Sequence, residues 1–138
     1  MITPEFRKKI RVIFYYYKRL LNIPKYWHVR IGTNDTIHAY AEVSYDYQEK
    51  RFSIVINPKL NQDLDDLKDS ILHELIHILF TPATARIELL LRKVECNEKF
   101  NIKRAKKNRT VYEEYLVNHF TKLIINQENV YHDKKRNT

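Results

Sequence analysis

Apolar residues recur at three- and four-residue steps in four stretches of the chain, and this spacing predicts four helices. Thr3 is placed to cap the first of them, and Pro4 fits its first position, where a backbone N–H is not needed. The pair Thr81-Pro82 interrupts the pattern after the second helix, so we expect a break there. The predicted helices are residues 4–21, 63–80, 83–100 and 109–127.

Between the first two helices the pattern changes to short runs that are rich in β-forming residues. These runs predict strands at residues 27–31, 36–45 and 51–57, with turns between them. Three consecutive short strands predict a small antiparallel sheet, and residues 51–57 could form an edge that holds a peptide by strand addition. One helix, this sheet and three further helices make an α+β fold.

The length and composition of the chain are those of a globular protein. A chain of 138 residues, 43% of them hydrophobic, is enough for a single core. We expect one domain over residues 1–128 and a basic, disordered tail over residues 129–138. The single cysteine, Cys96, precludes an intramolecular disulfide. Without a signal-peptide pattern or an apolar stretch of membrane-spanning length, the sequence predicts a cytoplasmic protein of a bacterium or its virus, with no membrane partner.

Positive charge is concentrated in two parts of this chain, whose formal net charge is +8. One is the tail sequence Lys134-Lys135-Arg136, and the other is a run from Lys99 to Arg109, which we expect to form a loop between the last two helices. Solvated loop charge that keeps a tyrosine-rich protein in solution is one interpretation of this run. A phosphate-binding patch with nucleic acid as its partner is the other.

The second predicted helix contains the sequence His73-Glu74-Leu75-Ile76-His77. Residues four apart on a helix lie on one face, so both imidazoles can reach the same metal ion. Glu74 stands beside the first imidazole, where it can act as a base on a metal-activated water. Polar side chains in this apolar helix need partners, which Zn²⁺ would supply. One alternative is that the two histidines are hydrogen-bonded residues of the core, and another is that they bind a metal ion that has only a structural role. With one cysteine in the chain, a Cys-rich structural site is excluded.

An open zinc site needs a third protein ligand, and the last predicted helix offers Glu113 and Glu114. Helical phase favours Glu113, which shares a face with the apolar residues of that helix. Glu114 is favoured by Asn118, four residues later, whose amide can hydrogen-bond to a ligating imidazole and orient it. Either glutamate could instead be an ordinary first-turn residue that stabilises a helix N-terminus.

The sequences His73-Glu74-Leu75-Ile76-His77 and Glu114-Tyr115-Leu116-Val117-Asn118-His119-Phe120 together resemble the gluzincin-like metallopeptidases. The second sequence is similar to the third-ligand helix of the ImmA/IrrE family, although Val117 and Thr121 replace its small residues. The upstream order, with a strand ending in Asn57-Pro58, is similar to small phage-encoded zincin domains. The resemblance implies a minimal zincin-like fold, a zinc ion held by His73, His77 and Glu114, and peptidase activity, but no particular substrate.

The predicted function is therefore zinc-dependent hydrolysis of peptide bonds in a peptide or protein substrate, with Glu74 as general base. A second group that stabilises the oxyanion is expected among Tyr112, Tyr115, His119, His28 and His38. The alternative is a non-catalytic phage or virion component, or a nucleic-acid-associated protein, that keeps the zincin fold as a scaffold.

Overall fold

The computed structural model describes residues 2–94 and 102–137, and within them the chain forms three helices and one three-stranded sheet. The α+β class that the sequence predicts is confirmed. Thr3 caps the first helix, because its hydroxyl oxygen accepts a hydrogen bond from the backbone N–H of Phe6. The elements are, in order, α1 (Pro4–Leu20), β1 (His28–Thr33), β2 (Ala41–Asp46), β3 (Arg51–Ile56), α2 (Leu64–Val94) and α3 (Ile102–Arg136).

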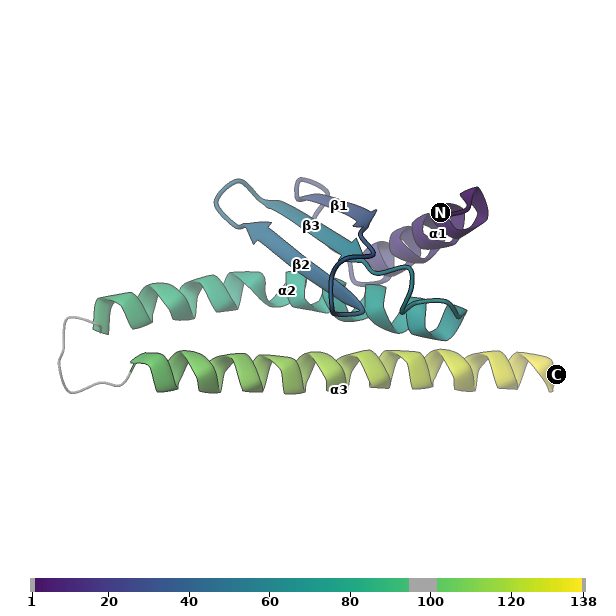
Figure 1. Cartoon of the computed structure of the whole chain (residues 1–138). Coiled ribbons are helices and arrows are strands. Elements are labelled where there is room, and N and C mark those ends of the chain that lie inside the picture. The colour runs from purple at the N-terminus through teal and green to yellow at the C-terminus, as the bar shows by residue number, and fades with distance from the viewer. Residues whose placement is uncertain (1, 95–101, 138) are drawn as a thin grey trace.

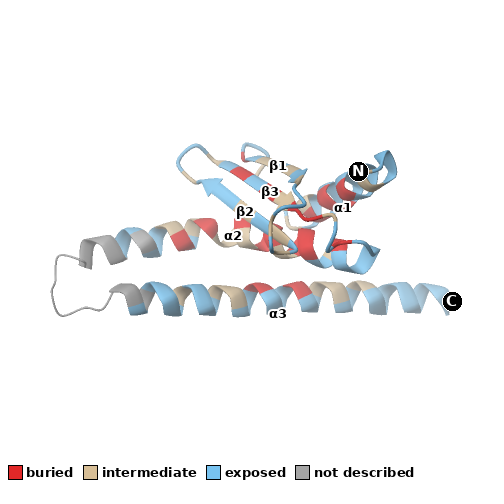
Figure 2. Cartoon of the chain, in the orientation of Figure 1, coloured by how far each residue is buried: buried red, intermediate tan, exposed pale blue. Residues whose placement is uncertain are grey.

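Helix α2 is the middle layer of the molecule, with the sheet on one side and α3 on the other (Figure 1). Its central part is therefore apolar almost all round, and Ile71, Leu72, Leu75 and Ile78 are completely buried there. The buried residues of α1 and of β3 join the same core, and the buried positions gather where these elements face α2 (Figure 2). Each such side chain contributes about 1.5–3 kcal/mol through its removal from water.

The sheet is mixed, so the prediction of an antiparallel sheet is wrong in this respect. β2 pairs antiparallel with β3, but β1 pairs parallel with β3, and the strand order is β1-β3-β2. The link after β1 crosses the end of β3 instead of making a tight turn. Asn57 holds this link, because its side-chain amide donates to the carbonyl of Ile37 (2.7 Å) and its backbone N–H donates to that of Tyr40 (2.9 Å).

The central strand is β3, and not an edge strand as residues 51–57 were expected to be. Its inward residues Phe52, Ile54 and Ile56 are the most deeply buried of the sheet, which favours a position with a neighbour on each side. The two edges are β1 and β2. Of these, β2 makes contacts with α2, so any strand addition near the histidine helix would involve β2.

The chain makes one helix, α2, where the sequence predicts two separated at Thr81-Pro82, and the predicted total of four helices is wrong for this reason. A proline inside a helix removes one backbone hydrogen bond and costs about 3 kcal/mol. Packing of α2 between the sheet and α3 offsets this cost, and two hydroxyl contacts flank Pro82. The hydroxyl of Thr81 donates to the carbonyl of His77 (3.3 Å), and the hydroxyl of Thr84 donates to Glu113 of α3 (3.1 Å).

Helix α3 is longer at both ends than the predicted residues 109–127. Residues 102–109 of the basic run are helical rather than a loop, while Lys99 and Cys96 lie outside the described residues. Residues 129–136, predicted as a disordered tail, continue the helix. Glu128, just before these residues, connects α3 to α1, because the Tyr17 hydroxyl of α1 donates a hydrogen bond to its carboxylate (2.9 Å). No helix among the described residues is both long and apolar enough to cross a membrane.

Candidate metal centre

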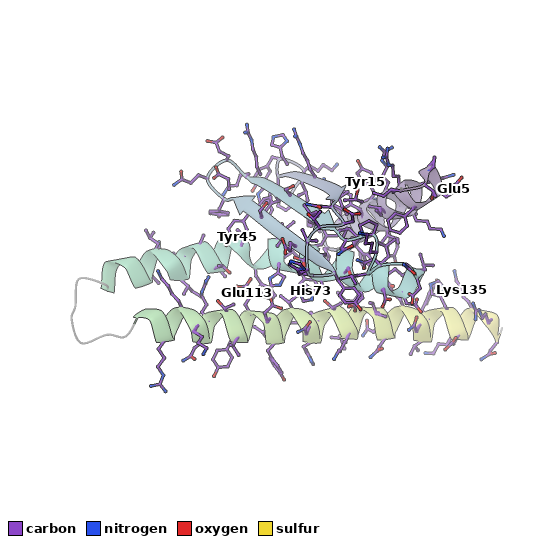
Figure 3. The ribbon with its side chains drawn as sticks, in the orientation of Figure 1. Glu5, Tyr15, Tyr45, His73, Glu113 and Lys135 are labelled. Carbon is purple, nitrogen blue, oxygen red and sulfur yellow. The ribbon has the colours of Figure 1, made fainter. Side chains whose placement is uncertain are left out.

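His73 and His77 lie on the face of α2 that is directed toward α3. Both side chains are mostly buried, and their Nε2 atoms are 3.2 Å apart. His73 and Glu113 are seen in the space between the two helices in Figure 3. The helical spacing that brings the histidines onto one face therefore also aims both Nε2 atoms at one point.

Glu114 of α3 brings a carboxylate to the same point. Its Oε1 lies 2.9 Å from Nε2 of His77, and its Oε2 lies 3.5 Å from Nε2 of His73. One ligand atom from each of the three residues lies within 4.8 Å of the others. The packing of α3 against α2 thus completes a cluster of two imidazoles and one carboxylate.

The spacing of the two imidazole nitrogens fits a tetrahedral zinc ion. Ligands that are about 2.0–2.1 Å from zinc in a tetrahedral site are about 3.3 Å from one another. The separation of 3.2 Å between the two imidazole nitrogens is close to this value. The two oxygens of Glu114 lie 2.9 Å and 3.5 Å from these nitrogens, one oxygen beside each ring, so its carboxylate reaches both imidazoles. Two His and one Glu also match the donor types of open zinc sites. His73, His77 and Glu114 are therefore the residues that could hold Zn²⁺.

Glu113 has a different place from Glu114 although the two are consecutive. Its Oε1 lies 2.9 Å from Nδ1 of His77, on the far side of the ring from the cluster. Its Oε2 accepts a hydrogen bond from the Thr84 hydroxyl (3.1 Å). A carboxylate that accepts the Nδ1–H proton leaves Nε2 as the unprotonated, metal-binding nitrogen. Glu113 and Thr84 thus orient His77.

Burial and the Asn118 side chain act in opposite directions on the pKa of His73. Burial lowers the pKa of His73, and the neighbouring imidazole of His77 lowers it further. Glu114, Asp69 and a side-chain hydrogen bond with Asn118 raise it to a smaller extent. The net lowering favours the neutral imidazole, which is the form that binds metals. The structure thus places Asn118 beside an imidazole of the cluster, as its spacing from Glu114 predicts.

Glu74 points into a cavity beside the cluster. Only 7% of the residue is exposed, and its carboxylate has no hydrogen-bond partner within the described part of the chain. Burial raises the pKa of Glu74 to about 7; Glu114 and Glu42 add to this shift, and His77 opposes it. A carboxyl group with this pKa can both accept and donate a proton near neutral pH. The cavity has a volume of about 300 Å³, and His73 also lines it.

The expected oxyanion-stabilising residues do not gather at this cavity. Tyr112 and Tyr115 are largely exposed on α3, and the His119 ring stacks on that of Tyr115. His28 lies in a separate hollow on the outer face of the sheet, and His38 is exposed in the link after β1. None of these five residues lines the cavity that holds Glu74.

Two residues near the cluster, Tyr40 and Thr84, were missed by the sequence analysis. Tyr40 lines the cavity, and Thr84 contacts Glu113. Thr84 stands seven residues after His77, so helical spacing could have placed it on the histidine face. Asp69, which also lines the cavity, stands in the polar stripe that the sequence shows along this helix. Tyr40 precedes β2 and had no such signal.

The family resemblance that the sequence suggests depends on a few motif positions, whereas the geometry of the site belongs to this chain itself. No model of a protein family, no curated protein and no solved structure matches the chain, so the interpretation of the site depends on that geometry.

Proposed function

We propose that this protein is a zinc-dependent metallopeptidase. The observation that supports the proposal most is that a possible metal-binding cluster and a carboxylate that could act as a base lie beside the same cavity. His73, His77 and Glu114 bring one ligand atom each within 4.8 Å of one another, and the unpartnered carboxylate of Glu74 lines a cavity that His73 shares. Histidines with only a structural role would not need a carboxylate that faces the same cavity without a hydrogen-bond partner among the described residues.

Each residue has a defined task in the proposed reaction. Zinc, when bound, supplies a Lewis acid that polarises the scissile carbonyl and acidifies the attacking water. Glu74 accepts a proton from that water while the water oxygen attacks the carbonyl carbon. Glu74 then delivers the proton to the amide nitrogen as the carbon–nitrogen bond breaks, which yields a carboxylic acid and an amine. Glu113 holds the imidazole of His77 in the orientation that keeps its Nε2 directed at the cluster.

The free edge of β2 is the proposed place for the peptide backbone. Tyr40 and Ala41, at the start of this strand, line the same cavity as His73 and Glu74. In its register with β3, β2 directs the backbone groups of Ala41 and Val43 away from the sheet, since the Tyr40 carbonyl already accepts from Asn57. An extended peptide could pair with these groups and lie along the edge next to the cluster.

Cleavage of a mixed peptide pool by the zinc-loaded protein tests this proposal. The wild-type protein should produce new amino termini, and Glu74→Gln should lower the rate by roughly 10²–10⁴ while zinc stays bound. Zinc binding without any cleavage by the wild type would instead favour the non-catalytic scaffold. Equal rates for the two proteins would reject Glu74 as the base.

A further inference from the structure

The cavity beside the metal cluster is acidic although the chain as a whole is basic. The chain carries a formal net charge of +8, yet the charged residues that line this cavity are Asp66, Asp69 and Glu74, with His73 at its inner end. Asp66, Asp69 and His73 follow one another at three- and four-residue steps along α2. They therefore form one stripe that leads to the cluster.

These aspartates lack a positively charged partner. Within residues 2–94 and 102–137, neither Asp66 nor Asp69 forms an ion pair with a lysine or arginine. The pKa of Asp66 is raised by desolvation and by repulsion from Asp63, Asp69 and Asp65. A cationic group in this cavity would relieve the repulsion.

Glu74 is a second and independent sign that the cavity takes a ligand. It is more than nine-tenths buried, has no hydrogen-bond partner among the described residues and lines the same cavity. Tyr40 and Ala41 form the opposite wall, at the start of the free edge of β2. A side chain that projects from a peptide on this edge would enter the cavity between β2 and the stripe on α2.

We propose that the cavity selects substrates with a lysine or arginine side chain close to the scissile bond. This inference rests on the proposed peptidase function and names the substrate class of that site. The cationic end of the side chain pairs with Asp69 and Asp66, and its methylene chain packs against Tyr40 and Ala41. Peptides with an acidic residue at the same position are repelled by the two aspartates.

Peptide binding to the zinc-loaded Glu74→Gln variant tests the inference without turnover. The probes are fluorescent pools of short random peptides that share one fixed central residue, Lys, Leu or Glu, and anisotropy gives their affinities. We expect the Lys pool to bind roughly fivefold to tenfold more tightly than the Leu pool, as suits two partly exposed ion pairs. The Glu pool should bind most weakly, and added salt should reduce the differences.

Asparagine substitutions assign the preference to the cavity. Adding Asp66→Asn and Asp69→Asn should abolish the preference for Lys and leave zinc affinity almost unchanged. The matched control, Asp65→Asn, removes one charge from the same helix turn at a residue that does not line the cavity, and it should keep the preference. Equal affinities for the three pools, no binding of any pool, or loss of the preference in the control as well would each overturn the inference.

Cleavage data separate this inference from the proposed function. If the wild type cleaves peptides and Lys or Arg is enriched at one fixed position near the cut, both are supported. Cleavage with no such enrichment overturns the inference and leaves the peptidase function standing. Preferential binding of the Lys pool without any cleavage by the wild type rejects the peptidase function and supports a cavity that binds basic side chains.

Discussion

The carboxylate of Glu113 lies 2.9 Å from Nδ1 of His77, and this contact assigns different positions to two consecutive glutamates. Glu114 lies 2.9 Å from the other ring nitrogen of His77, Nε2. One imidazole is thus held between two carboxylates, one inside the cluster and one behind it. In a zinc site, the carboxylate behind the ring would orient the ligand, and the one inside would bind the metal.

Glutamine substitutions at these two positions should therefore weaken zinc binding to different extents. Glu113→Gln keeps the three donor atoms but weakens the hold on His77, and we expect a loss of roughly 10–100-fold in zinc affinity. Glu114→Gln removes a charged donor and should cause a larger loss. Competition with a chromophoric chelator measures both affinities. A larger loss for Glu113→Gln than for Glu114→Gln would reverse the two assignments.

Thr84 should affect the affinity for zinc only through its contact with Glu113. Thr84→Val removes the hydroxyl that donates to Glu113 and keeps the shape of the side chain. Loss of one hydrogen bond of about 1 kcal/mol corresponds to a fivefold lower zinc affinity. Thr84→Ser keeps a hydroxyl and should restore most of the affinity. If Thr84→Val lowers zinc affinity equally in the Glu113→Gln background, the two residues act independently and the proposed chain of contacts is wrong.

Zinc should also stabilise the fold, because the proposed ligands come from both α2 and α3. A free zinc concentration one hundred times the dissociation constant would add about 2.7 kcal/mol to the free energy of unfolding. For a chain of this size, that is an increase of roughly 10 °C in the unfolding temperature. Differential scanning calorimetry with and without zinc measures the shift. Glu114→Gln at the same zinc concentration is the control and should show a much smaller shift; an equal shift would place the stabilising zinc elsewhere.

Because of the contact between Tyr17 and Glu128, the free energy of unfolding should decrease as the pH rises above about 10. Burial, followed by the hydrogen bond to Glu128, raises the pKa of Tyr17 above its ordinary value of 10.0. Below about pH 10, Tyr17 is protonated in both the folded and the unfolded chain, and the contact stabilises the fold fully. Above that pH the unfolded chain loses the proton first, so the stabilisation falls by about 1.4 kcal/mol per pH unit.

Tyr17→Phe isolates this effect. At neutral pH the variant should be about 1–3 kcal/mol less stable, because the half-buried Glu128 loses its partner. The difference from wild type should shrink as the pH rises above 10, as measured by urea unfolding at each pH. Tyr15→Phe changes an exposed tyrosine of the same helix and serves as the control. A difference for Tyr17→Phe that stays constant from pH 8 to 11 would contradict the raised pKa.

The sequence predicted which segments are helices and strands better than it predicted how they connect. Apolar spacing within α1 and around His73 is a local property, so it could be read without knowledge of the fold. The continuity of α2 through Pro82 depends on contacts such as that between Thr84 and Glu113, which are distant in sequence. The parallel pairing of β1 with β3 likewise depends on the path of a link that Asn57 holds, and alternation alone does not specify it.

The same division applies to the candidate site. His73, Glu74 and His77 could be placed because one helix fixes their spacing. The choice between Glu113 and Glu114 could not be made, because it depends on how α3 lies against α2. Helical phase favoured Glu113 and the spacing to Asn118 favoured Glu114, and both carboxylates do contact His77. Each argument thus identified a residue near the histidines, and only the packing of the two helices distinguishes their positions.

The content of zinc per chain tests the central claim most directly. The protein is purified without metal, incubated with zinc and dialysed. Elemental mass spectrometry should then measure one zinc ion per chain. His73→Ala and His77→Ala should each remove most of it, whereas His28→Ala, which changes a histidine outside the cluster, should not. Less than about a tenth of an equivalent in the reconstituted wild type would contradict the zinc site and the function proposed for it.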